Sequence, residues 1–336
     1  MNLRRILFIG LILIMLTGAY TAWYVFSPLP VKQTADVYIP SGSSVTKSVS
    51  LVQQQHIINH PTLFKLLLRV YCTITGKNVY AGTYRFTNEH SHAHVLRALV
   101  SGKQALTVKV TFPEGITATK FASILKKEIG TDSTEFMAYI HSDSLKQALN
   151  ITSPSLEGYL MPNTYEFFWK QPEKDIVLFL IGEQQKIWET RFEQECRTKG
   201  KTKNEILTLA SIVEAETPQP TERARVAGIY TNRLNRGMKL DADPTVQYAL
   251  GESRRLLYND LTINSPYNTY MNIGLPPGPI NNPSPSSIDA ALHPEQNNYI
   301  YFCAKGDGSN THSFAVTATE HQVNVMRYRK NRRNKD

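Results

Sequence analysis

Cysteine is scarce in this chain, and its three cysteines form no pattern. Cys72, Cys196 and Cys303 stand far apart among 336 residues. An odd number at such spacing indicates neither a disulfide framework nor a zinc site. We expect three small buried apolar side chains, with one disulfide as the alternative in an oxidising compartment.

Net positive charge is small outside the two ends of the chain. Of the net charge of +9, residues 327–336 carry +5 and Arg4 and Arg5 carry +2, which leaves +2 for the body. Binding of nucleic acid needs basic side chains spread along a groove. The sequence therefore gives no reason to expect a nucleic-acid partner, and residues 329–336 are predicted to be a solvated basic tail.

Signatures of several enzyme classes are also missing. The chain has no G-x-S-x-G, no H-E-x-x-H and no Rossmann-like glycine fingerprint. Asp241-Ala242-Asp243 could be the metal site of a glycosyltransferase, but such a site needs a nucleotide-sugar fold. His90, His92 and His94 are an alternative metal site, although only His90 and His94 would share a helical face. We expect no metal and no cofactor.

One long hydrophobic run is present near the N-terminus. Residues 6–26 contain no charge, and as a helix they would span about 30 Å, the thickness of a bilayer core. Arg4 and Arg5 precede the run, whereas Tyr20, Trp23 and Tyr24 lie at its far end. This pattern predicts a single-pass anchor of the inner (plasma) membrane with residues 1–5 in the cytoplasm and the body outside it. A cleaved signal peptide is the alternative.

The body is predicted to have a mixed α+β fold. Residues 37–52 and 110–125 each read as a strand, a Pro-x-Gly turn, a Ser/Thr cap and a helix, which is either an internal repeat or ordinary strand–helix sequence. Such units resemble LysM-like modules, which bind N-acetylated glycans. Further helices are expected over residues 62–71, 93–100, 175–194, 203–216 and 221–235, and long functional loops from Gly237 to Ser287.

The helix at residues 203–216 contains the strongest candidate for an acid. Glu214 follows an uncharged run from Ile206 to Val213, and a carboxyl beside apolar residues can be desolvated, which raises its pKa. A general acid for an ether-type leaving group needs this property. The alternative is a helix-end carboxylate in an ion pair with Arg223 or Arg225.

Several ordered motifs resemble those of the MltG (YceG-like) endolytic murein transglycosylases. The first, LEGYLMPNTY at residues 156–165, is similar to the family signature L-E-G-x-L-x-P-[DN]-T-Y. The others, in family order, are ASIVEAET (210–217), YTNRL (230–234), DPTVQY (243–248), YNTY (267–270), GLPPGPI (274–280), NPS (282–284), YF (301–302) and HSF (312–314). Met161 stands where the family usually has Phe, Asn163 often replaces Asp at its position, and Ala215 stands where Lys is common.

The resemblance implies a LysM-like subdomain over residues 36–104 and a catalytic domain over residues 105–328. It implies cleavage of the MurNAc–GlcNAc β-1,4 bond within peptidoglycan strands, leaving 1,6-anhydroMurNAc ends. The family's catalytic acid corresponds here to Glu214. The predicted supporting or substrate-binding residues are Glu157, Glu216, Asn232, Asp243, Gln247, Tyr267, Asn268, Thr269, Tyr270 and His312.

The chemistry explains why one carboxyl group can suffice. Hydrolases place two carboxyl groups across the bond, whereas a lytic transglycosylase uses the sugar's own C6 hydroxyl, so that positioning replaces the second group. The predicted partners are peptidoglycan strands, the cell membrane and a peptidoglycan synthase. The rival from another class is a catalytically silent, glycan-binding scaffold of the cell-wall synthesis machinery.

Overall fold

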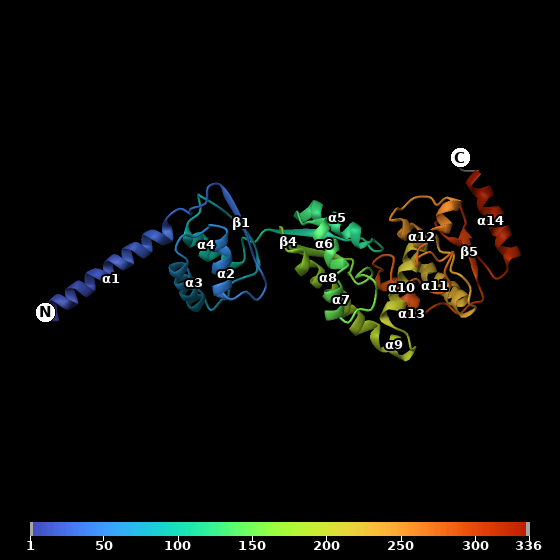
Figure 1. The fold of residues 1–336 in the computed structure, drawn as a ribbon, viewed down its shortest axis with the longest axis horizontal. Helices are drawn as coiled ribbons and strands as arrows, with labels where there is room; N and C mark the ends of the chain where they lie inside the picture. The colour runs from blue at the N-terminus through green and yellow to red at the C-terminus, as the bar shows by residue number, and fades with distance from the viewer. Residues whose placement is uncertain (1–2, 334–336) are drawn as a thin grey trace. The chain divides into compact units, whose positions relative to one another are not determined.

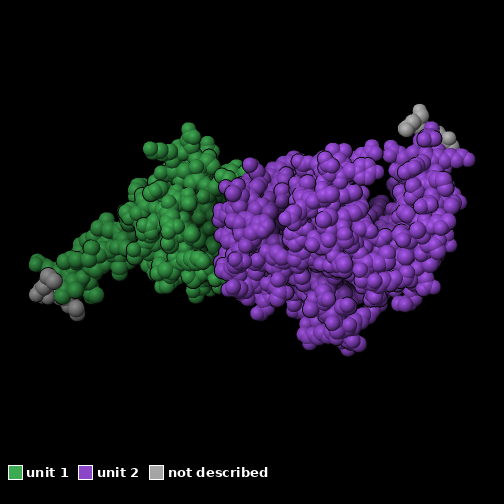
Figure 2. All heavy atoms as spheres, turned by 45° about the vertical axis from the view of Figure 1, so that its right-hand side comes forward, with its two compact units in different colours: residues 1–109, 166–171 green, residues 110–165, 172–336 purple. Residues whose placement is uncertain are grey.

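The computed structural model describes residues 3–333, which form two compact units (Figure 2). Unit 1 comprises residues 1–109 and 166–171, and unit 2 comprises residues 110–165 and 172–336. Residues 1–2 of the predicted cytoplasmic segment and residues 334–336 of the predicted tail lie outside the described residues. The predicted division at residues 104 and 105 is a few residues from the boundary between the units, but residues 166–171 return to unit 1.

The N-terminal apolar run forms helix α1 (Leu3–Phe26), which is long and apolar enough to cross a membrane. Most of its large apolar side chains are exposed, including Phe8 at 64% and Ile14 at 70%. Trp23 is also exposed, as an interfacial aromatic residue would be. Tyr24 was predicted to be another interfacial residue, but its side chain is buried in the core of unit 1. The centroid of its ring lies 4.1 Å from that of His92.

Unit 1 is built on an antiparallel pair of strands, β1 (Thr34–Ile39) and β2 (Gly82–Thr87), in the register Val37 to Tyr84. Three helices complete it: α2 (Val45–Gln54), α3 (Pro61–Thr75) and α4 (His92–Ser101). The Ser44 hydroxyl caps α2 by accepting from Lys47 N. Apolar side chains from both strands and all three helices form one core.

The histidines of unit 1 do not form the alternative metal site. The rings of His90 and His94 stack at 3.9 Å, while His92 is buried against Tyr24. Among the described residues, no three His, Cys, Asp or Glu side chains are grouped as metal ligands would be. The three cysteines are free, and only Cys196 is fully buried.

Strands β3 (Thr107–Thr111) and β4 (Thr164–Phe168) pair with each other, and both strands pass from one unit into the other. In unit 2, β3 leads through Gly115 (φ +73°) into α5 (Ala118–Ile129), whose cap is Thr117. This arrangement matches β1, Gly42 (φ +71°) and the Ser44 cap of α2. The two strand–turn–helix segments predicted from the sequence therefore have the same local form.

The first part of unit 2 is helical. Helices α6 (Ser133–Ile140) and α8 (Glu173–Arg191) pack against each other, and α7 (Asp143–Ala148) lies between them in sequence. The helix predicted over residues 175–194 is in fact two. Phe192, with its side chain buried and its φ at −125°, ends α8 before α9 (Glu193–Thr198) begins.

The second part of unit 2 centres on α10 (Lys203–Glu216), which packs against α11 (Pro220–Asn235) and α13 (Pro285–Leu292) (Figure 1). A capping box between Thr202 and Glu205 begins α10 at the predicted position. Residues 206–213 of α10 are all buried, as an uncharged run between packed helices should be.

The segment from Gly237 to Ser287 is less irregular than predicted. It contains α12 (Asp243–Leu250) and the 3-10 helix η1 (Tyr258–Thr262). Pro244 lies in the first turn of α12 and Gly251 ends it in a left-handed conformation, which are ordinary helix boundary signals.

The C-terminal part is a hairpin followed by a helix. Strands β5 (Tyr301–Ala304) and β6 (His312–Ala315) are antiparallel, and α14 (Ala318–Arg333) packs against both. Residues 329–333 of the predicted solvated tail are helical and continue α14. Their side chains are nevertheless mostly exposed.

Candidate active site

The two glutamates of the ASIVEAET motif point to different surroundings at the end of α10. Glu214 is almost fully enclosed, with 6% of its side chain exposed. Its Oε1 accepts a hydrogen bond from Arg223 at 2.7 Å, and its Oε2 accepts from Ser284 N at 2.9 Å and Ser284 Oγ at 2.5 Å. The sequence alternative of an ion pair with Arg223 is thus what the geometry shows, while Arg225 pairs with Glu295.

Glu214 is also covered from the side of the β3–α5 turn. A Cβ on Gly115 would lie 2.9 Å from Glu214 Cγ, so only glycine allows the turn this close an approach. Arg223 is held in turn by the hydroxyls of Ser284 and Ser286. Glu214 therefore connects α10 to α11 through its hydrogen bond with Arg223, and to the start of α13 through those with Ser284.

Glu216 has the environment that was predicted for Glu214. Its Oε1 accepts a hydrogen bond of 2.6 Å from the hydroxyl of the buried Tyr230. Burial, with a further contribution from the nearby negative charge of Asp243, raises the pKa of Glu216 to about 7, although Tyr230 and Arg233 act in the opposite direction. The carboxyl is thus partly protonated near neutral pH.

Glu216 lines a cavity of about 450 Å³ in unit 2, formed by the ends of α10 and α12, the β5–β6 hairpin and α14. Three other predicted site residues line the same cavity: Asp243, Tyr270 and His312. The Tyr270 hydroxyl donates to Asp243 Oδ1 at 2.6 Å. His312 is oriented by Glu222, which accepts from His312 N at 3.0 Å and lies 2.8 Å from His312 Nδ1.

A second cavity, of about 510 Å³, lies beside the first. Ala215 and Pro244 line it, while their chain neighbours Glu216 and Asp243 line the first cavity. Two more predicted residues, Glu157 and Gln247, are in its wall. The two cavities are therefore neighbours at the end of α10 and the start of α12.

Glu157 has a structural position in the wall of this second cavity. Its buried carboxyl accepts from Ala118 N at 2.9 Å and from Asn282 Nδ2 at 2.7 Å, which joins the start of α5 to the NPS motif. Burial raises the pKa of Glu157 to about 8, against these donors, which lower it. Gln247, in the same wall, donates to the carbonyl of Arg254 at 2.8 Å.

Three other predicted residues support loops. Asn268 is fully buried and donates to the carbonyls of Leu261 and Ile263. The Thr269 hydroxyl accepts from Ala242 N, directly before α12. Asn232 donates to the carbonyls of Asn297 and Tyr299. None of these three residues lines the cavity of Glu216. Tyr267 packs on Tyr248, with 4.9 Å between the ring centroids.

Several residues of the site were not predicted. Arg233, Asp241 and His321 line the cavity of Glu216, and Arg233 pairs with Asp241 at 3.0 Å. His321 stacks on Tyr301 at 5.1 Å, and its Nδ1 is buried without a hydrogen-bond partner. The YTNRL motif contained a signal for Tyr230 and Arg233, because polar residues on one helix next to an acid are candidates for contact with it.

Comparison with known proteins shows which family the chain resembles. The sequence model of the YceG-like family matches residues 37–327. The chain is 33% identical, over 316 residues, to the endolytic murein transglycosylase of Bacillus subtilis (strain 168), covering 88% of this chain and 85% of that protein. It is 27% identical to the protein of the same name from Streptococcus pneumoniae serotype 2, of whose length it spans 59%.

A solved structure also relates this chain to YceG-like proteins. The crystal structure of a putative YceG-like protein of Listeria monocytogenes superposes with a TM-score of 0.60 at 30% sequence identity. The match covers 87% of this chain and 99% of that protein. The motif resemblance is therefore confirmed, and the chain belongs to the YceG-like family.

Proposed function

We propose that this chain is an endolytic murein transglycosylase that uses Glu216 as its general acid and base. It cleaves the MurNAc–GlcNAc β-1,4 bond within peptidoglycan strands and leaves 1,6-anhydroMurNAc ends. The names of the relatives support the activity. The observation that supports Glu216 is its position in a cavity with its pKa raised to about 7.

The choice between the two glutamates follows from their contacts. Glu214, the acid expected from the motif, has both oxygens occupied by donors and lines neither of the two cavities at the ends of α10 and α12. A general acid needs an oxygen that carries a proton and reaches the leaving group. Within residues 3–333, the Tyr230 hydroxyl gives Glu216 its one side-chain hydrogen bond, which leaves the second carboxyl oxygen open. Glu214 is then a positioning residue that fixes α10 to α11 and α13.

The reaction needs one proton carrier. Glu216 gives its proton to the glycosidic oxygen as the bond from that oxygen to C1 of MurNAc breaks. The C6 hydroxyl oxygen of the same sugar forms the new bond to C1, and its proton returns to Glu216. Because the nucleophile belongs to the substrate, positioning substitutes for a second catalytic carboxyl group.

The surroundings suit a charged transition state. Positive charge develops at C1 and the ring oxygen, and the exposed carboxylate of Asp243, fixed by Tyr270, is in the same cavity. Preoriented negative charge of this kind stabilises such a state. The two neighbouring cavities at the ends of α10 and α12 would hold the sugars that flank the broken bond, as cleavage within a strand requires.

The remainder of the chain would bring this site to its substrate. Helix α1 would anchor the protein in the inner membrane with the body outside the cytoplasm, as Arg4 and Arg5 suggest. Unit 1, the predicted LysM-like part, would bind the N-acetylated glycan. Tethering beside a peptidoglycan synthase would let the enzyme cut nascent strands and end their elongation.

The products of a peptidoglycan digest test the proposed activity. Anhydro-forming cleavage gives fragments lighter by one water, about 18 Da, than those of hydrolysis. Fragments with reducing ends would overturn the proposal and point to a second carboxyl group such as Asp243. Binding of nascent strands with no cleavage would favour the silent scaffold instead.

A further inference from the structure

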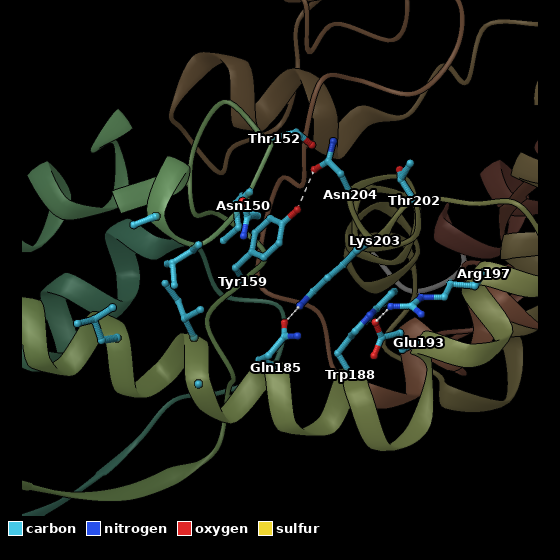
Figure 3. A pocket seen from close by; sticks show the side chains of 16 residues that line it. Asn150, Thr152, Tyr159, Gln185, Trp188, Glu193, Arg197, Thr202, Lys203 and Asn204 are labelled. Carbon is cyan, nitrogen blue, oxygen red and sulfur yellow. Dashed lines mark hydrogen bonds and ion pairs between the residues drawn. The ribbon is translucent and has the colours of Figure 1, made fainter. Parts of the chain in front are cut away.

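A third and larger cavity, of about 830 Å³, lies in unit 2 and shares no residue with the two cavities at the ends of α10 and α12. Its walls come from the loop at residues 148–152, from α8 and α9, and from the first turn of α10 (Figure 3). The proposed reaction uses none of these residues.

The cavity contains an ammonium group between two aromatic rings. Lys203 Nζ lies 5.5 Å from the ring centroid of Tyr159 and 5.2 Å from that of Trp188, both within cation–π distance. It donates one hydrogen bond, of 2.5 Å, to Gln185 Oε1 (Figure 3). An ammonium has three donors, so Lys203 retains hydrogen-bonding capacity for a ligand.

The charge of Lys203 is not neutralised by a carboxylate. Glu189 and Glu193 are the acids whose negative charges act on Lys203. Each is bonded to another residue, because Glu189 accepts a hydrogen bond from Gln185 Nε2 and Glu193 pairs with Arg197. Lys203 forms no ion pair in the described part of the chain. Burial accordingly lowers the pKa of Lys203 to about 8. A partly buried cation without a counter-ion favours an anionic ligand.

The remaining wall combines apolar and amide groups with two threonines and the ion pair of Glu193 with Arg197. Leu149, Ile181 and the two aromatic rings supply apolar surface. Asn150, Gln185 and Asn204 supply amide groups, which both donate and accept hydrogen bonds as peptide groups do. This composition suits a short peptide better than the aliphatic chain of a fatty acid.

We propose that this cavity binds a free carboxylate of a short peptide, with Lys203 as its counter-ion. The inference extends the proposed function, because murein strands carry short peptides that contain free carboxylates. Occupation of the cavity would let the protein distinguish strands with peptides from strands without them. The site is separate from Glu216, so it would affect the choice of substrate and leave the chemical step unchanged.

Titration calorimetry on the full chain in detergent micelles tests this inference. The probes are a peptidoglycan stem tetrapeptide with free carboxylates, the same peptide with its carboxylates amidated, and decanoate. We expect the free peptide to bind at least about tenfold more tightly than the amidated peptide, as loss of one charge-assisted contact implies. Lys203→Met should remove this difference, and Lys203→Arg should retain it.

Lys201→Met is the matched control, because Lys201 is exposed and lies two residues away. It should bind both peptides as the unsubstituted chain does. Equal binding of free and amidated peptide by the unsubstituted chain would overturn the proposal without any variant. Binding of decanoate in place of the peptide would overturn it also.

Cleavage of peptide-free strands separates this inference from the proposed function. Lys203→Met should cleave such strands at the unchanged rate. If the chain binds the peptide but cuts no strand, the proposed function fails and the peptide site stands. If it cuts strands but does not bind the peptide, only the peptide site fails.

Discussion

At the scale of single residues, helical geometry separates two glutamates that are close in sequence. Successive residues of a helix are rotated by about 100°, so Glu214 and Glu216 face directions about 200° apart. One direction leads to Arg223 and Ser284, and the other leads to Tyr230 and the cavity. The two carboxyl groups therefore have different partners and different roles in our proposal.

The rate of cleavage should depend on pH through Glu216. The general acid must carry its proton, so kcat/KM should fall about tenfold per pH unit above the pKa of about 7. Asp243→Asn removes a negative charge that raises this pKa and should move the fall to lower pH. Tyr230→Phe removes a donor that lowers it and should move the fall to higher pH.

Rates measured from pH 5 to 9 check these opposite shifts. A fall at the same pH in all three proteins would mean that another group is the acid. Glu214→Gln gives the matched control, because its profile should keep the fall near pH 7.

The sequence motifs located the region of this site, whereas the choice between its two glutamates is our proposal from their contacts. Glu216, Asp243, Tyr270 and His312 belong to separate motifs of the sequence, and all four line one cavity. The uncharged run before Glu214 pointed to that residue. Its pairing with Ser284, 70 residues away in the chain, depends on tertiary packing, which one sequence does not show.

At the scale of elements, local signals decided which predictions succeeded. The capping box at Thr202 and Glu205 fixed the start of α10. The boundary signals of α12, Pro244 and Gly251, were obscured by a polar and proline-rich surrounding sequence. Asn268, Thr269 and Asn232 were predicted to be supporting or substrate-binding residues, and they bind backbone groups that hold the loops around α12 and α11.

Gly158, in the LEGYLMPNTY motif, should tolerate no side chain. Its φ is +84°, and a Cβ would lie 2.4 Å from Pro279. Strained backbone and overpacking together should make Gly158→Ala lower the free energy of unfolding by about 2–5 kcal/mol. Gly200→Ala is the control, because Gly200 has φ +62° but open space around it, and should cost only about 1 kcal/mol.

Chemical denaturation followed by circular dichroism measures both changes. Equal effects of the two substitutions would show that the contact with Pro279 does not matter. The same contact explains why the motif contains glycine, since it lets the loop lie against the GLPPGPI segment.

At the scale of the whole molecule, buried acids should make stability depend on pH. Glu157 has a pKa of about 8 in the folded protein, whereas an unfolded glutamate titrates near 4.3. Between these values the folded protein binds a proton that the unfolded chain has released. The free energy of unfolding should therefore fall as pH rises, by up to about 1.4 kcal/mol per unit for this residue.

Denaturation at pH 5, 6, 7 and 8 measures this slope. Glu157→Gln should make it shallower, and Glu114→Gln, at an exposed position, should leave it unchanged. Glu216 should contribute in the same direction between about 4.5 and 7. A slope that Glu157→Gln does not alter would show that its proton is not bound on folding.

Helix α1 should determine where the protein is found. Burying its exposed apolar side chains in lipid is strongly favourable. The full chain should sediment with membranes and resist extraction by salt, whereas residues 27–336 should remain soluble. Partition of the shortened chain into membranes would show that other parts of the protein bind lipid.

The most direct test of the central claim is a comparison of Glu216→Gln with Glu214→Gln in the peptidoglycan digest, with fragments identified by mass spectrometry. We predict that Glu216→Gln produces no anhydro fragments while remaining folded. Glu214→Gln should retain cleavage, reduced in proportion to its loss of stability, because its single amide oxygen can accept from Arg223 or from Ser284 but not from both. Full cleavage by Glu216→Gln, with none by a folded Glu214→Gln, would contradict our account and identify Glu214 as the acid.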